Sequence, residues 1–145
     1  MAAASDYLEN KMVDHIFRAQ TFAAPTTLYI SLYTGAPSDS GGGTEVSGGS
    51  YARVSVTCSL ANWAGTQGAG TTVASSGSSG TTSNNNAITF PTSSASWGLC
   101  THFGIHDAAS AGNLLFEGAL TSSVTIGSGE TRSFAAGALT VQVDN

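Results

Sequence analysis

Charged side chains are scarce in this chain of 145 residues, where they make up 9% of the sequence, against about 25% in an average soluble domain. The formal net charge is −5, and the only basic residues are Lys11, Arg18, Arg53 and Arg132. Four cations are too few to form a basic stripe that could neutralise phosphates. Binding to nucleic acid or to an anionic membrane surface is therefore not expected. A neutral polar surface costs little to desolvate, which favours association with other proteins.

Cysteine and long apolar runs are scarce as well. The two cysteines, Cys58 and Cys100, form no C-x-x-C pair and are too few for a disulfide scaffold. They are expected to pack as free thiols, with a bridge within or between subunits as the alternative. No apolar run approaches the roughly 20 residues that span a bilayer, and no basic segment followed by an apolar one opens the chain. The chain is expected to stay in the cytoplasm where it is made, or to leave it inside a larger particle.

The motifs of common catalytic and cofactor sites are missing. The sequence contains no G-x-S-x-G elbow, no phosphate-binding loop and no H-E-x-x-H zinc motif. On a strand, the Cα atoms of His102 and His106 would lie about 13 Å apart, too far to share one metal without a bulge at Gly104. The histidines are therefore expected to be solvated or hydrogen-bonded around buried Phe103 and Ile105. No catalytic residue, metal or cofactor is predicted.

One segment has the apolar spacing of a helix. Ser5 can cap its N-terminus, and Asp6 and Glu9 lie in the first turn, where the helix dipole favours negative charge. These features predict an amphipathic helix over residues 5–19. It is expected to pack against the chain's own strands, with contact to a neighbouring subunit as the alternative. Its apolar stripe consists of Leu8, Met12, Val13, Ile16 and Phe17.

From residue 26 onward the apolar period changes to two, which indicates strands. Residues 65–86 contain no charge and almost no apolar side chain, so they are expected to form a long Gly/Ser/Thr/Asn loop outside the core. The pattern predicts a mainly β chain and a single domain over residues 1–145. In it, one N-terminal helix precedes an antiparallel β-sandwich or jelly-roll-like domain over residues 26–144. Strands are expected at residues 26–34, 51–59, 87–90, 99–107, 113–120, 123–128, 131–134 and 138–144.

Large aromatic side chains flank the predicted strands and loops. In the first strand, the tyrosines project from the face opposite to Leu28, Ile30 and Leu32, so both faces are expected to be covered. Core packing is the ordinary role of such rings and contact with a partner is the alternative. Arg53 is expected to pair with a carboxylate of its own chain or of a partner. The candidate interface residues are Tyr29, Tyr33, Tyr51, Arg53, Trp63 and Trp97.

Several separated motifs are shared with one family of proteins. They are DYLENKMVDHIF, APTTLYISLYTGAP, GTEVSGGSYARVSV and THFGIHDAASAGNLLFEGAL. Through them the chain resembles, nearly from end to end, a family of small structural proteins of tailed bacteriophages that are labelled tail-fibre proteins or capsid cement proteins. Residues 65–86 and the two cysteines lie outside the shared pattern.

The resemblance implies a virion protein that is not an enzyme. The favoured role is a capsid cement or decoration protein, made in the host cytoplasm, that forms a homotrimer on the outer head surface and clamps copies of the major capsid protein. The alternative is a tail or tail-fibre component in which residues 65–86 contact host-surface glycans. A small hydrolase or lectin unrelated to virions is a third interpretation.

Overall fold

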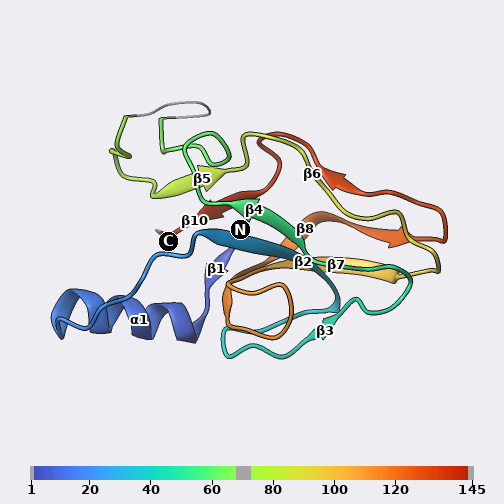
Figure 1. Cartoon of the computed structure of the whole chain (residues 1–145), viewed down its shortest axis with the longest axis horizontal. Coiled ribbons are helices and arrows are strands. Elements are labelled where there is room, and N and C mark those ends of the chain that lie inside the picture. The colour runs from blue at the N-terminus through green and yellow to red at the C-terminus, as the bar shows by residue number, and fades with distance from the viewer. Residues whose placement is uncertain (1, 68–72, 144–145) are drawn as a thin grey trace.

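The computed structural model describes residues 2–67 and 73–143 of the chain. In Figure 1 a short strand leads into one helix, and the elements that follow among the described residues are strands, which pair antiparallel. The mainly β fold with one helix near the N-terminus is therefore confirmed. The elements are β1 (Ala3–Ala4), α1 (Asp6–Phe17), β2 (Thr27–Gly35), β3 (Thr44–Glu45), β4 (Val54–Thr57), β5 (Thr81–Ser83), β6 (Ile88–Thr89), β7 (Gly98–His106), β8 (Leu114–Ile126), β9 (Ser133–Phe134) and β10 (Thr140–Gln142).

A large antiparallel sheet forms the centre of the molecule. Its strands lie in the order β1-β8-β7-β2-β3, and β4 also pairs with β2. Strands β2 and β7 pair in a register that places Ile30 opposite Ile105 and Leu32 opposite Phe103. The alternation predicted for β2 is confirmed, because Leu28, Ile30 and Leu32 belong to the core while the tyrosines lie on the other face.

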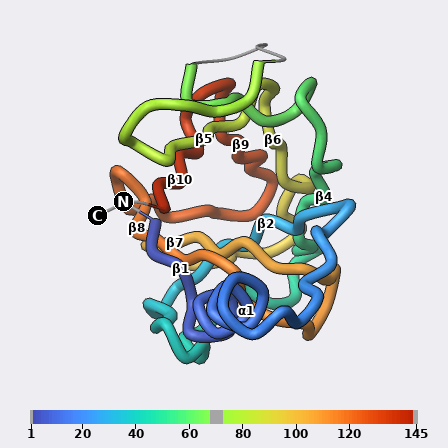
Figure 2. Tube along the Cα trace, turned by 90° about the vertical axis from the view of Figure 1, so that its left-hand side faces the viewer, coloured from blue at the N-terminus to red at the C-terminus, as the bar shows by residue number. Residues whose placement is uncertain are grey.

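Two small sheets cover one face of the large sheet, while α1 lies on the opposite face (Figure 2). The small sheets pair β10 with β5 and β6 with β9, so the second layer of the sandwich consists of two separate strand pairs. The apolar core fills the space between these layers. Its buried members include Ile30, Leu32, Ile88, Phe90, Trp97, Cys100, Phe103, Ile105, Ile126, Leu139 and Val141.

The segment 65–86 is only partly the loop that its composition predicts. Near its end, Thr81–Ser83 form β5, which pairs with β10. Asn84 is 1% exposed. Its side chain accepts a hydrogen bond from the Leu139 N–H and donates to the Ala135 carbonyl. The expectation that this segment stays outside the core is therefore wrong for Asn84, because an asparagine can be buried when its amide is fully hydrogen-bonded.

Strand β8 joins two segments that the sequence predicts as separate strands. Cys100 pairs with Val124, but His102, two residues further on, pairs with Ala119. The additional residues of β8 therefore bulge out of the ladder. On its outer side, β1 is the one strand among the described residues that pairs with β8, at Phe116 and Glu117.

Candidate interaction surfaces

Helix α1 turns its apolar stripe away from the body of the protein. Leu8 is its only buried residue, and Tyr7, Lys11 and Asp14 form the half-buried side that faces the body. The stripe itself is exposed, increasingly so toward the end of the helix: Met12 37%, Val13 50%, Ile16 64% and Phe17 79%. The expectation that the stripe packs against the chain's own strands is therefore wrong for all of it except Leu8. We call these four exposed residues the α1 ridge.

Contacts at the N-terminal end of α1 hold it on the body in this orientation. The Ser5 hydroxyl accepts a hydrogen bond from the Leu8 N–H and donates to the Leu114 carbonyl, which fixes the first turn on β8. Further along, the Lys11 ammonium lies 5.6 Å from the centre of the Tyr7 ring. The helix therefore begins on the body and projects from it, with its apolar side outward. A contiguous exposed apolar surface of this kind marks an interaction site.

A second apolar surface is a hollow at the edge of the core. It has a volume of about 550 Å³. Leu60 and Val143 at its rim are 56% and 55% exposed. None of the described residues that line it is charged. We call it the apolar hollow; its lining includes Leu28, Cys58, Leu60, Trp63, Phe116 and Val143.

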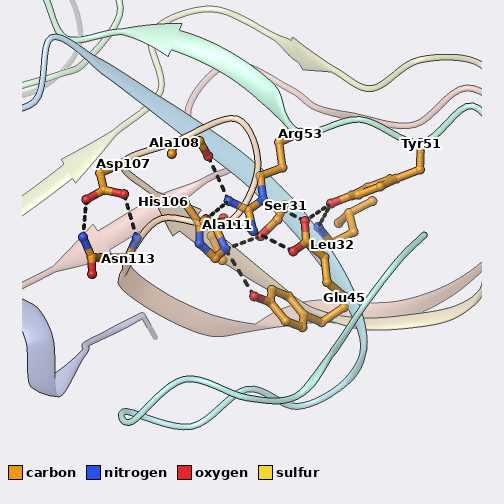
Figure 3. A network of polar contacts seen from close by, with 12 residues as sticks. Ser31, Leu32, Glu45, Tyr51, Arg53, His106, Asp107, Ala108, Ala111 and Asn113 are labelled. Carbon is orange, nitrogen blue, oxygen red and sulfur yellow. Dashed lines mark hydrogen bonds and ion pairs between the residues drawn. The ribbon is translucent and has the colours of Figure 1, made fainter. Parts of the chain in front are cut away.

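A polar network on the α1 side of the large sheet is centred on Arg53 (Figure 3). Its Nε and Nη2 atoms donate to the two carboxylate oxygens of Glu45 at 2.8 and 2.7 Å. Its Nη1 atom donates to the carbonyls of Ala108 and Ala111 at 2.8 and 2.9 Å. The Arg53 side chain is only 8% exposed. Its expected pairing is therefore made with the chain's own carboxylate, and it holds the loop after β7 against the sheet.

Two tyrosines extend this network. The Tyr51 hydroxyl donates to Glu45 Oε1 at 3.0 Å and accepts from the Leu32 N–H at 2.9 Å. The Tyr33 hydroxyl lies 3.2 Å from His106 Nε2. The network thus links β2, β3 and β7 with the segment before β4.

Burial and pairing shift the pKa values of this network. Burial, and to a smaller extent the nearby Arg53 charge, lower the pKa of His106 to about 4, so the ring is neutral at pH 7. Burial by itself would raise the pKa of Glu45, but the hydrogen bonds and charge of Arg53 hold it below its ordinary value. Burial also raises the pKa of Tyr33. Arg53 thus favours the ionised form of Glu45, and burial favours the protonated form of Tyr33, which suits a structural clamp.

The histidines expected to be solvated or hydrogen-bonded differ in environment. His106 is 4% exposed, whereas His102 is half-buried, with Nδ1 2.8 Å from the Thr101 hydroxyl. Among residues 2–67 and 73–143, no cluster of three or more His, Cys, Asp or Glu side chains could hold a metal ion.

The structure brings four of the six candidate interface residues together. Tyr33, Tyr51 and Arg53 belong to the polar network, and Trp97 packs edge-on against Tyr51 with ring centres 5.3 Å apart. The Trp97 indole N–H donates to the Gly49 carbonyl at 2.9 Å. These contacts lie within the chain, and a role of the four residues at an interface stays a prediction.

The other two candidates lie apart from this group. Tyr29 is half-buried and lines a groove between α1 and the segment that leads into β2. Trp63 is half-buried in the apolar hollow. The α1 ridge was visible in the sequence as an apolar stripe, but no signal in the sequence showed that it faces outward.

The two thiols are free and have different surroundings. Cys100 is fully buried in the core, whereas Cys58 is exposed at the apolar hollow. Burial raises the pKa of both thiols.

None of the described helices has the length and apolar character that would let it cross a membrane.

Comparison with known proteins places the chain in a family. No curated protein matches it. A family model does match, over residues 3–142, and its description is podophage GP4 fiber I protein gp80. This match covers nearly the whole chain and confirms the resemblance seen in the sequence motifs. The chain therefore belongs to the podophage GP4 fiber I protein gp80 family, among the small structural proteins of tailed phages.

Proposed function

We propose that this protein is a subunit of a phage fibre and that it acts by attaching to other proteins of the virion rather than by catalysis. The observation that carries the proposal is the α1 ridge, where Met12, Val13, Ile16 and Phe17 point away from the body. Apolar side chains on one side of a projecting helix gain free energy when a partner covers them. The partners we propose are copies of the same chain and a larger virion protein.

The description of the matched family supports a fibre rather than the capsid surface. A role as a capsid cement protein that clamps the major capsid protein is the second candidate. It is favoured by the shape of the chain: α1 has 12 residues, and the described residues contain neither a longer helix nor a repeated strand motif that could build a fibre shaft. A body with one short arm suits the decoration of a surface.

The copy number in purified particles tests the proposal. Quantitative mass spectrometry would measure the chain relative to the major capsid protein. A small fraction supports the fibre, and an equimolar amount supports the capsid cement role. Absence of the chain from purified particles would overturn both.

Particles that carry a ridge variant test the attachment surface. We expect Ile16→Ser to reduce incorporation into particles. The matched control is Leu99→Ser. Leu99 is also apolar and is 52% exposed, but it lies on β7, outside the ridge. Equal incorporation of both variants would contradict attachment through α1.

A further inference from the structure

We infer that the α1 ridge of one copy packs into the apolar hollow of a second copy, so that the chains join head to tail. This inference rests on the proposed function, because it names the partner for one of the attachment surfaces. It concerns a contact between two different surfaces of the same chain, one convex and one concave.

Exposed apolar side chains gather at these two surfaces. The described residues include eight large apolar side chains that are exposed; four form the α1 ridge, three lie at the apolar hollow, and the remaining one is Leu99. Those at the hollow are Leu60, Val73 and Val143. Both surfaces expose apolar side chains to water, and the convex ridge fits the concave hollow in shape.

The charge distribution favours this pairing. The described lining of the hollow contains no charged residue, and the four ridge side chains are uncharged. The cation closest to the ridge end, Arg18, pairs with Asp14 at 2.7 Å on the other side of α1. Contact between ridge and hollow therefore buries no charged side chain of the ridge itself or of the described lining, which would be costly without a partner. A strongly charged partner would gain nothing at either surface.

The size of the ridge favours a closed ring of copies. Its four side chains expose on the order of 400 Å², whereas a stable interface buries about 800 Å² on each partner. In a ring, each copy contributes its ridge to one neighbour and its hollow to the other. This uses both surfaces of every chain, and the ring closes without free ends. The predicted homotrimer would be one such ring.

The native Cys58 provides a direct test, because its thiol is exposed at the hollow. The variant Ile16→Cys places a new thiol on the ridge. Because the native Ile16 side chain is 64% exposed, folding is expected to be unaffected. Under mild oxidation we expect disulfide-linked multimers on a non-reducing gel, which return to monomers on reduction. Phe17→Cys is a second variant at the same surface and guards against a failure of the first to fold.

Two control variants show which thiols react. Cross-linking should be lost when Ile16→Cys is combined with Cys58→Ser. It should also be absent for Ser122→Cys, an exposed position in the bulge of β8. Cross-links that persist without Cys58 would mean that two ridges contact each other, and would overturn the inference.

Measuring the mass of the native chain in solution tests this inference independently of the proposed function. We expect light scattering at high concentration to give one discrete multiple of the monomer mass. A monomer that forms no cross-link would overturn the ridge-in-hollow contact and leave the ridge to another virion protein. The proposed function fails separately, when the chain is absent from purified particles.

Discussion

Arg53 shows how a chain with few charges uses one of them inside the fold. Its guanidinium makes two hydrogen bonds to Glu45 and two to backbone carbonyls, and its side chain is 8% exposed. A paired and fully hydrogen-bonded cation can be buried at modest cost, but removal of one partner leaves the other charge unsatisfied.

For Arg53→Ala we therefore expect the free energy of unfolding to fall by about 3–5 kcal/mol, the range found when a buried ion pair loses one member. Urea denaturation would measure it. The matched control is Arg18→Ala, because Arg18 also pairs with a carboxylate, that of Asp14, but its side chain is 68% exposed. Such a surface pair contributes about 0–1 kcal/mol. Equal losses in the two variants would contradict the role of Arg53 as a clamp.

The buried His106 ring makes stability depend on pH. Its pKa is about 4 in the folded chain, against an ordinary value of 6.5. The unfolded chain therefore binds more protons between these values, and stability falls as the pH falls through this window. Between about pH 7.5 and about pH 5 we expect the free energy of unfolding to fall by about 2 kcal/mol. The variant His106→Gln should not show this fall.

Urea denaturation of both proteins at the two pH values would measure this difference. The control is His15→Gln, which changes an exposed histidine of α1 and should retain the full pH dependence. Glu45 also contributes stability that acid removes, but that loss begins near its ordinary pKa of 4.5 and so lies below both pH values compared. The same pH dependence in the His106 variant and the native chain would contradict the assignment.

At the scale of the element, one side of α1 is predicted to contribute to the stability of the monomer and the other side to contribute almost nothing to it. Leu8 is 8% exposed, so Leu8→Ala should lower the free energy of unfolding of the diluted monomer by about 2–3 kcal/mol. The double variant Met12→Ser and Ile16→Ser should change it by less than about 0.5 kcal/mol per site, as surface substitutions do. Thermal or urea denaturation measures both. A similar loss in the two would mean that the ridge packs against the chain's own body.

The elements also show what the sequence could reveal. Strand β2 was predictable because Leu28, Ile30 and Leu32 alternate with polar residues over a long run, and α1 because Ser5 caps a helical period. Strands β1, β3 and β5 have two or three residues each, too few for any period to appear. Their pairing depends on partners far along the chain, which local sequence does not encode.

The candidate site was less predictable than the fold. An apolar stripe shows which side of a helix is apolar, but not whether that side meets the same chain or another one. The direction of α1 is set by the hydrogen bond between Ser5 and the Leu114 carbonyl, across more than a hundred residues. The pairing of Arg53 with Glu45 was expected only as one of two alternatives, because either the chain or a partner could supply the carboxylate.

At the scale of the whole molecule, assembly should depend little on salt. The ridge and the hollow are uncharged, and the net charge of −5 gives the copies only weak mutual repulsion. Salt screens that repulsion and leaves apolar contacts in place, so the association constant should stay constant or rise from low to molar sodium chloride. Analytical ultracentrifugation would measure it, with the double ridge variant as control. A steep weakening with salt would show that ion pairs hold the copies together.

The bulge in β8 affects how copies of this chain behave when they are crowded together. Beyond the residues paired with β1, the outer edge of β8 has no strand beside it among the described residues. A straight, neutral edge would invite any other chain to add a strand through its backbone, which is the route to aggregation. The additional residues between Ala119 and Val124 distort this edge, so that another strand cannot pair with it in a regular register. Recognition is thereby left to side chains, whose shape distinguishes the right neighbour from the wrong one.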